Sequence, residues 1–280
     1  MEQVFAMTTP HYKFRLKVSD IDDPVHIRRF DIGDAKGICL EASLIMPDAD
    51  ERFAIDAHIC TVSKLDTLDS CLLEPSDSET SLGTELILGF ISILKANYPH
   101  ITQLSLRDSS FIPCDRSLGE TLDLLTYSIA LYGKTWYEQV LGAHVQNAAE
   151  FRRYRDAIAV YMSPAAKRDW VWEQFWAMIA GKNRFANEKI RENVDGFKRI
   201  FDEATTWPEC IKRMKNAVEK SDKCKFFKTW LEQFIYSHVP EKRDWVVDIE
   251  RNTILTNVLN TRSQRPMRAR TSTRKRKRMM

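Results

Sequence analysis

Three residues in the first quarter of the chain bring a carboxylate, an imidazole and a thiol together at a spacing of two. Asp56, His58 and Cys60 lie in an apolar run, and alternate residues of a strand point to one face of the sheet. A carboxylate can orient an imidazole as a general base, and a thiol can serve as a nucleophile. Residues two apart on a strand have Cα atoms about 6–7 Å apart, so their side chains diverge. We therefore favour a structural role on the covered side of a sheet.

The string Gly-Lys-Thr at positions 133–135 is a second candidate, because it matches the end of a phosphate-binding loop. That motif also needs a glycine five positions before its Gly-Lys pair, and residue 128 is a serine. The surrounding sequence is helical and does not run from a strand into a helix. We reject a nucleotide loop here and expect Trp136 and Tyr137 to anchor a helix to the sheet.

The segment 74–85 joins the end of a strand to the start of a helix, where backbone N–H groups and the helix dipole can hold phosphate. It contains a single glycine. Its carboxylates would repel an anion: Glu74, Asp77, Glu79 and Glu85. We favour a solvated loop, with Ser81 capping the helix, over a phosphate site.

Periodicity predicts the elements that position these residues. Strands are expected over 12–18, 26–32, 38–46 and 52–62, the last two forming an antiparallel hairpin. A helix is expected from Ser81 to Asn97, ended by Pro99, with a strand following over 101–106. A strand–helix–strand crossover normally joins parallel neighbours in one sheet.

The rest of the chain is predicted to be helical. Residues 118–141 indicate a helix that breaks near Gly133, and further helices are expected over 148–162, 164–181, 184–204, 208–220, 224–238 and 244–260. The expected fold class is α+β. It comprises a mixed-sheet α/β domain over 1–147, an all-α domain over 148–261 packed through Trp and Phe, and a disordered basic tail over 262–280.

The order of the first elements resembles the core of GNAT-type N-acyltransferases. The resemblance covers residues 35–145 and rests on the antiparallel strands, a helix entered at Ser81-Leu82-Gly83-Thr84, the strand over 101–106, and a helix ending Trp136-Tyr137-Glu138-Gln139-Val140-Leu141-Gly142. That family ends its fourth helix with Phe-Tyr-Glu-Lys-x-Gly-Phe, and it cradles the acyl-CoA pyrophosphate at the start of the preceding helix.

The resemblance implies a role for four residues and a cofactor, acetyl-CoA. Tyr137 would be the general acid for the departing thiolate, Asp56 the general base, and Gly83 and Thr84 would donate N–H groups to the pyrophosphate. The chain departs from the family's Arg/Gln-x-x-Gly-x-Gly/Ala loop, because it has one glycine and no basic residue there. A descendant without catalytic activity is therefore an open alternative.

Charge is distributed unequally along the chain. Residues 1–149 hold 12 basic and 22 acidic side chains, and residues 150–261 hold 21 basic and 17 acidic ones. Residues 262–280 carry nine Lys or Arg and no acid, ending in Arg274, Lys275, Arg276, Lys277 and Arg278. Like charges at this density repel one another and resist burial, so we expect this arm to be disordered and to bind a polyanion.

Three roles for the arm stay open: recognition by a nuclear import receptor, contact with nucleic-acid phosphates, and binding to an anionic membrane leaflet. The first two are favoured, because no lipidation motif or apolar anchor accompanies the arm. The Gly-Lys-Thr-Trp-Tyr-Glu string together with this arm also resembles uncharacterised proteins of large DNA viruses.

Basic residues also gather near tryptophans in the helical region, as at Arg152, Arg153, Arg155, Lys167 and Arg168. Such clusters can grip phosphates and stack bases. Interspersed acids favour the alternative, in which the aromatics form a core and the basic side chains are solvated.

The six cysteines are scattered and form no C-x-x-C pair, which indicates reduced thiols in a cytosolic or nuclear protein and no zinc site. No apolar run is long enough to span a membrane, and no secretory signal is recognised.

Two functions follow as hypotheses. One is a non-catalytic nuclear, cytoplasmic or virion protein, without a cofactor or metal, that contacts nucleic acid or an import receptor through its arm. The other is an acyl-CoA-dependent N-acyltransferase.

Overall fold

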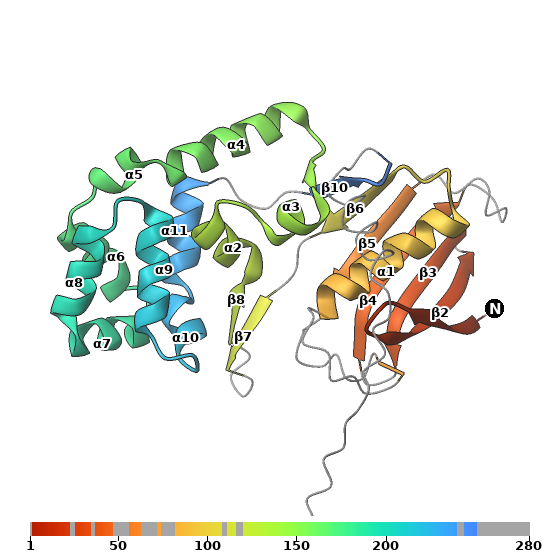
Figure 1. Ribbon diagram of the computed structural model, residues 1–280, viewed down its shortest axis with the longest axis horizontal. Helices are drawn as coiled ribbons and strands as arrows, with labels where there is room; N and C mark the ends of the chain where they lie inside the picture. Colours follow the sequence, from red (N-terminus) through yellow and green to blue (C-terminus); the bar gives the residue numbers. More distant parts are fainter. Residues whose placement is uncertain are drawn as a thin grey trace, which may run out of the picture.

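The first five strands form an antiparallel meander in which each strand pairs with the next (Figure 1). They are β1 (Glu2–Thr8), β2 (Lys13–Asp22), β3 (His26–Asp34), β4 (Gly37–Met46) and β5 (Asp56–Val62). Phe14 and Leu16 of β2 are buried whereas Lys13 and Arg15 are exposed, so the alternation seen in the sequence sets the buried face. The strands predicted over 12–18, 26–32 and 38–46 are confirmed, as is the described part of the one over 52–62. Strand β1 is an additional strand.

The computed structural model describes residues 2–22, 26–34, 37–46, 56–62, 72–73, 82–107, 111–115, 120–239 and 244–250. Over these residues the molecule has two lobes. One is a sheet covered by one helix, the other is a group of helices, and α2 and α3 lie between them (Figure 1). The overall class is α+β, as predicted. No helix within the described ranges is long and apolar enough to cross a membrane.

Helix α1 (Leu82–Asn97) crosses from β5 to the parallel strand β6 (Gln103–Arg107), which confirms the predicted strand–helix–strand unit. Its apolar residues are buried against the sheet, and the rings of Phe90 and Phe30 meet edge to face at 5.5 Å. This packing is the core of the first lobe.

The predicted helix over 244–260 is wrong in its described part, because Asp244–Asp248 forms strand β10. This strand inserts between β6 and the short strand β9 (His144–Val145), antiparallel to both. Trp245, Val246 and Val247 are all buried there. The two valines favour a strand, and the free edge of β6 provides hydrogen-bonding partners for their backbone groups. The region after residue 148 is therefore not all-α, since its end returns to the first lobe.

The stretch predicted as one helix over 118–141 contains three elements. Strand β8 (Glu120–Asp123) pairs with β7 (Phe111–Asp115) in a separate hairpin, and α2 (Leu124–Tyr132) and α3 (Trp136–Leu141) follow. The predicted break at Gly133 is confirmed: this residue ends α2 with φ of 62°, a left-handed conformation that glycine adopts without strain. The sequence pattern did not indicate the β7–β8 hairpin.

The second lobe is built around aromatic side chains, as predicted. Its helices are α4 (Ala148–Met162), α5 (Pro164–Arg168), α6 (Trp172–Ala180), α7 (Arg184–Glu192), α8 (Val194–Glu203), α9 (Trp207–Ala217), α10 (Lys223–Phe227) and α11 (Trp230–His238). The predicted helix over 148–162 is confirmed, and three others are each divided in two. Trp207, Trp230, Phe175 and Phe234 are buried, and the rings of Trp207 and Phe234 lie 4.5 Å apart.

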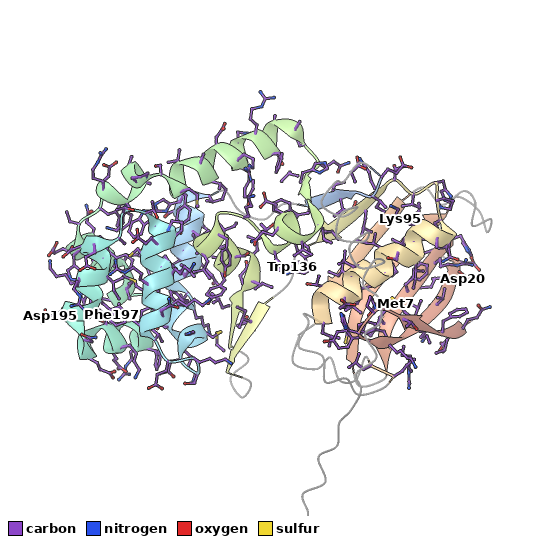
Figure 2. The ribbon with its side chains drawn as sticks, viewed as in Figure 1. Met7, Asp20, Lys95, Trp136, Asp195 and Phe197 are labelled. Atoms are coloured by element: carbon purple, nitrogen blue, oxygen red, sulfur yellow. A yellow bond between two sulfur atoms is a disulfide. The ribbon has the colours of Figure 1, made fainter. Side chains whose placement is uncertain are left out.

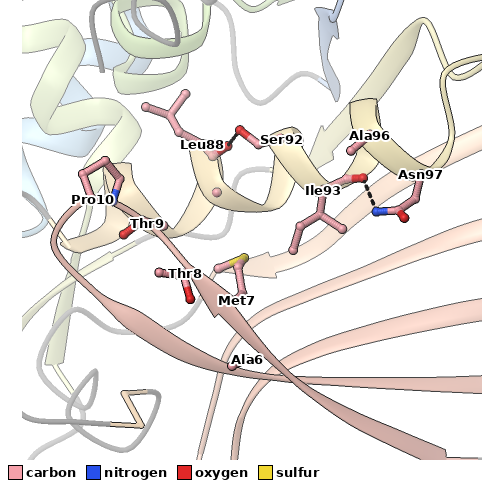
Figure 3. A pocket seen from close by; sticks show the side chains of 11 residues that line it. Ala6, Met7, Thr8, Thr9, Pro10, Leu88, Ser92, Ile93, Ala96 and Asn97 are labelled. Carbon is pink, nitrogen blue, oxygen red and sulfur yellow. Dashed lines mark hydrogen bonds between the residues drawn. The ribbon is translucent and has the colours of Figure 1, made fainter. Parts of the chain in front are cut away.

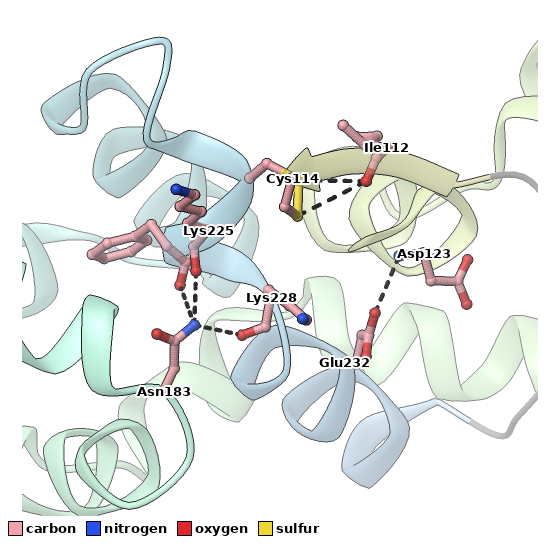
Figure 4. Close-up of a disulfide and its surroundings, with 9 residues drawn as sticks. Ile112, Cys114, Asp123, Asn183, Lys225, Lys228 and Glu232 are labelled. Carbon is pink, nitrogen blue, oxygen red and sulfur yellow. Dashed lines mark hydrogen bonds between the residues drawn. A yellow bond between two sulfur atoms is a disulfide. The ribbon is translucent and has the colours of Figure 1, made fainter. Parts of the chain in front are cut away.

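A disulfide joins Cys114 of β7 to Cys224 of α10 across 110 residues (Figure 4). Cys39 is disulfide-bonded as well. The expectation of reduced thiols is therefore wrong for these three cysteines. Cys114 and Cys224 are far apart in the sequence, and folding brings them together. Cys210 is free and buried, and burial raises the pKa of its thiol to about 12.

Candidate functional site

The first turn of α1 is the place where the sequence suggested a pyrophosphate site. Gly83 is buried and Thr84 is half-buried in this turn. Glu85 lies in the same turn with only 1% of its surface exposed. A carboxylate is the group that the positive end of a helix dipole attracts. Glu85 therefore places a carboxyl group in the turn that would hold a bound pyrophosphate.

The neighbouring strands β5 and β6 are joined over a short length. Their parallel pairing consists of His58↔Ser105 and Ile59↔Leu106, whereas β4 and β5 share six residue pairs. Among the described residues, the ladder between β5 and β6 is therefore shorter than that between β4 and β5.

Asp56 is the first residue of β5, so it lies on the strand that leads toward α1. The register between β4 and β5 shifts between Glu41 and Ala42, opposite Cys60. Such a bulge interrupts the strict alternation on which a common face for Asp56, His58 and Cys60 depends. The side chains of these three residues lie outside the described part of the structure.

Tyr137, the candidate general acid, lies in α3 and is 3% exposed. Its ring meets that of Trp136 nearly perpendicularly at 5.2 Å. Figure 2 shows Trp136 at the junction of the two lobes, where it packs against the hydrophobic core. Both aromatics therefore anchor α3, and a phenol enclosed in this way has little access to a bound substrate.

The string Gly-Lys-Thr is a turn between two helices, which confirms that it is not a nucleotide loop. Gly133 ends α2 and Thr135 begins α3. The Thr135 hydroxyl accepts a hydrogen bond from the backbone N–H of Glu138 at 3.1 Å, and the Thr135 N–H donates to the Glu138 carboxylate at 2.8 Å. This reciprocal capping box explains why threonine and glutamate stand three residues apart.

Glu138 is the centre of a buried polar network that the sequence did not reveal. Its carboxylate also accepts a hydrogen bond from the Tyr154 hydroxyl of α4 at 2.7 Å and one from Arg155 at 3.4 Å. The ring of Tyr154 packs edge to face on Trp245 of β10 at 5.5 Å. Burial, and secondarily the Glu138 charge, raises the pKa of Tyr154 well above its usual value. The network ties α3 and α4 to the strand that returns to the sheet.

Several basic side chains of the second lobe are paired with acids. Ion pairs join Arg184 to Glu188, Lys198 to Asp202, Arg213 to Glu203 and Glu209, and Lys189 to Glu192 and Asp222. The tryptophans beside them belong to the core. For these side chains the pairing favours a solvated surface. Of the predicted basic cluster, Arg155 pairs with Glu138 at 3.4 Å and Lys167 is buried.

Lys167 is a buried cation that the sequence analysis had placed in a basic cluster. It is 5% exposed, and its ammonium lies 3.4 Å from the centroid of the Phe201 ring and 5.3 Å from that of Trp207. Desolvation lowers its pKa. Attraction to the ring faces compensates part of the lost hydration. Its neighbours come from α8 and α9, so no spacing in the sequence could have revealed this role.

The surface of the described residues includes two hollows. The larger, of about 370 Å³, lies between the turn after β1 and α1 and is lined by Met7, Thr9, Pro10, Gly89 and Ile93 among others (Figure 3). A Cβ at Gly89 would lie 2.7 Å from the Thr9 methyl group, so glycine permits this close approach. The smaller, of about 230 Å³, is lined by Trp172, Glu173, Trp176 and Val194. Neither contains a predicted site residue.

Arg274, Lys275, Arg276, Lys277 and Arg278 lie outside the described residues. Among the residues that are described, no group of three or more His, Cys, Asp or Glu could hold a metal ion. No protein family, curated protein or solved structure matches the chain significantly.

Proposed function

We propose that this protein is non-catalytic and contacts nucleic acid electrostatically through residues 262–280, with the two folded lobes as its scaffold. The observation that carries the proposal is the division of charge: nine basic and no acidic side chains in the arm, against 33 basic and 39 acidic ones in residues 1–261. A net-negative body repels a polyanion, so the arm is the segment suited to bind one.

Two features of the first lobe support the non-catalytic part of this proposal. The buried Glu85 carboxylate sits in the turn that would bind a pyrophosphate, and the candidate acid Tyr137 is enclosed. The first puts a carboxyl group where a cofactor phosphate would lie, and the second leaves the phenol little access to a substrate, so both disfavour acyl-CoA chemistry.

The setting that we propose is a virion or a nucleus. The Cys114–Cys224 disulfide favours the virion, because disulfides persist at virion surfaces and are rare in the reducing nucleus and cytosol. The arm also has the composition of an import signal, which would act before assembly.

Removing the arm is expected to abolish DNA binding. If five of its charges contact phosphates, the affinity of the full chain for a labelled DNA duplex falls about 500-fold between 50 and 200 mM salt. Fluorescence anisotropy of the full chain and of residues 1–261 at both salt concentrations measures this. A variant with residues 274–278 changed to glutamine separates charge from chain length. Equal, salt-insensitive binding by all three would contradict the proposal.

A second candidate, an acyl-CoA-dependent N-acyltransferase of the GNAT type, is favoured by one specific observation. The parallel strands β5 and β6 share two residue pairs beside the crossover helix α1. This topology supports an acyltransferase-like fold for the first lobe, in which Gly83 and Thr84 would bind the cofactor and Asp56 and Tyr137 would transfer protons.

The non-catalytic proposal predicts that 1 mM acetyl-CoA leaves the melting temperature of residues 1–261 unchanged. A site that binds acetyl-CoA with a Kd of about 10 µM would add about 2.7 kcal/mol to the free energy of unfolding, and it would raise the melting temperature by several degrees. The arm is omitted because it would attract any polyanion, and ATP serves as the anionic control. A shift with acetyl-CoA but not with ATP, increased by Glu85→Gln, would contradict the non-catalytic proposal and favour the acyltransferase alternative.

A further inference from the structure

Strand β1 forms one edge of the eight-stranded sheet, and within the described residues only β2 pairs with it. Every residue of β1 except Met7 is exposed. Val4 is 61% exposed and Phe5 is 48% exposed, and as neighbours on a strand they face opposite sides of the sheet. The outer edge therefore presents backbone hydrogen-bonding groups flanked by apolar side chains on both faces.

Soluble proteins usually protect such an edge with charged residues, a proline or a bulge. In β1 the only charged residue is Glu2, at the end of the strand, where Lys17 of β2 pairs with it at 2.8 Å. The strand contains no proline, and its register with β2 runs without a shift from Glu2↔Ser19 to Thr8↔Lys13. Between Glu2 and Thr8, therefore, no proline and no bulge interrupts the edge, and its one charge lies at the end of the strand.

We propose that two copies of this chain associate by antiparallel pairing of their β1 strands, centred on Phe5. In this register Phe5 faces Phe5 of the second copy, Val4 faces Ala6, Gln3 faces Met7 and Glu2 faces Thr8. The two phenylalanines form a cross-strand aromatic pair, and no like charges lie opposite each other. This self-complementarity under a two-fold axis is the reason for choosing a second copy as the partner.

The position of Phe5 relative to α1 supports this register. Phe5 and Met7 share one face of the strand, and Met7 lies between β1 and α1, beside the hollow that Gly89 helps to line (Figure 3). Phe5 thus extends this apolar face along the edge strand itself. Pairing at Phe5 would continue this face into the second copy and would join the two sheets into one.

Sedimentation of the full chain tests the proposal. The wild-type protein is expected to show a species of twice 32.6 kDa whose population rises with concentration up to about 100 µM. Phe5→Lys places two ammonium groups opposite each other and is expected to raise the dissociation constant at least about tenfold. Val160→Lys is the matched control, because Val160 of α4 is 63% exposed and lies far from the edge in sequence. Circular dichroism checks that each variant is folded.

Cross-linking tests the register itself. Directly opposed residues of antiparallel strands have Cα atoms about 4.5–5.5 Å apart, within disulfide reach. Phe5→Cys is therefore expected to give a covalent dimer on mild oxidation, and Val160→Cys is expected not to. A wild-type chain that stays at 32.6 kDa at all concentrations would overturn the proposal. So would a dimer that Phe5→Lys leaves intact, or equal cross-linking of both cysteine variants.

Discussion

Replacing Cys114 and Cys224 together by serine is expected to lower the free energy of unfolding by about 4–5 kcal/mol. The disulfide spans 110 residues, so it removes a large amount of conformational entropy from the unfolded chain. It also binds the β7–β8 hairpin to α10. A change of this size is a large part of the stability of a typical domain.

The folded state itself should change little in this variant. The Asp123 N–H at the end of β8 still donates to Glu232 of α11 at 3.1 Å, and the Tyr236 hydroxyl donates to the Asp123 carboxylate at 2.9 Å. On the other side of α10, the Asn183 amide donates to the carbonyls of Lys225 and Lys228 at 2.8 and 2.7 Å (Figure 4). These contacts hold the hairpin and α10 in place without the covalent bond.

Urea denaturation of the wild type and of the double serine variant measures the effect. The variant is a cleaner comparison than added reductant, because Cys39 is also disulfide-bonded and would be reduced as well. Cys210→Ala controls for loss of a buried thiol outside any disulfide. An unchanged urea midpoint, or alkylation of both Cys114 and Cys224 in the native wild type, would contradict the disulfide.

Glu138→Ala is expected to lower the free energy of unfolding by about 3–5 kcal/mol, the range for removing one partner of a buried charged network. The substitution leaves the Tyr154 hydroxyl and the Thr135 N–H without their acceptor in a buried site. Each buried donor without an acceptor costs about 1–3 kcal/mol. Because the network links α3 and α4 to β10, its loss weakens the junction between the lobes.

Thermal and urea unfolding of Glu138→Ala, Tyr154→Phe and the double variant form a double-mutant cycle that isolates the coupling. The two changes are expected to be strongly non-additive, because each disrupts the same hydrogen bond. Glu188→Ala is the control. It removes an exposed i,i+4 ion pair with Arg184 and is expected to leave the midpoints of thermal and urea unfolding almost unchanged. Additive losses, or equal effects of Glu138→Ala and Glu188→Ala, would show that the network does not stabilise the junction.

Local patterns in the sequence were sufficient for much of the fold. The alternation at Lys13, Phe14, Arg15 and Leu16 indicated β2, and the helix over 82–97 with its parallel crossover to β6 followed from a change of period and from Pro99. The rejection of a nucleotide loop at Gly133 rested on a missing glycine. These features depend on neighbours in the chain, which the sequence shows directly.

The errors have a different origin, in partners that are distant in the sequence. Val246 and Val247 form a strand because β6 offers a free edge: they pair with Ser105 and Leu104, which lie far earlier in the sequence. The sequence between Phe111 and Asp123 forms a hairpin that packs against α10, where a helix had been expected from residue 118. Strand β1 escaped prediction because all of its residues except Met7 are exposed, which leaves no alternation to recognise.

By itself, the sequence determined the α+β class, the apolar faces of β2 and α1, the aromatic composition of the second lobe and the separation of a cationic arm from an acidic body. Only the tertiary structure decided that Cys114 meets Cys224, that β10 returns to the sheet, that Glu85 occupies the start of α1 and that Glu138, Tyr154 and Trp245 meet. The physical reason is that propensity, capping and charge act over a few residues. Burial and pairing instead depend on which distant surfaces the folded chain brings into contact.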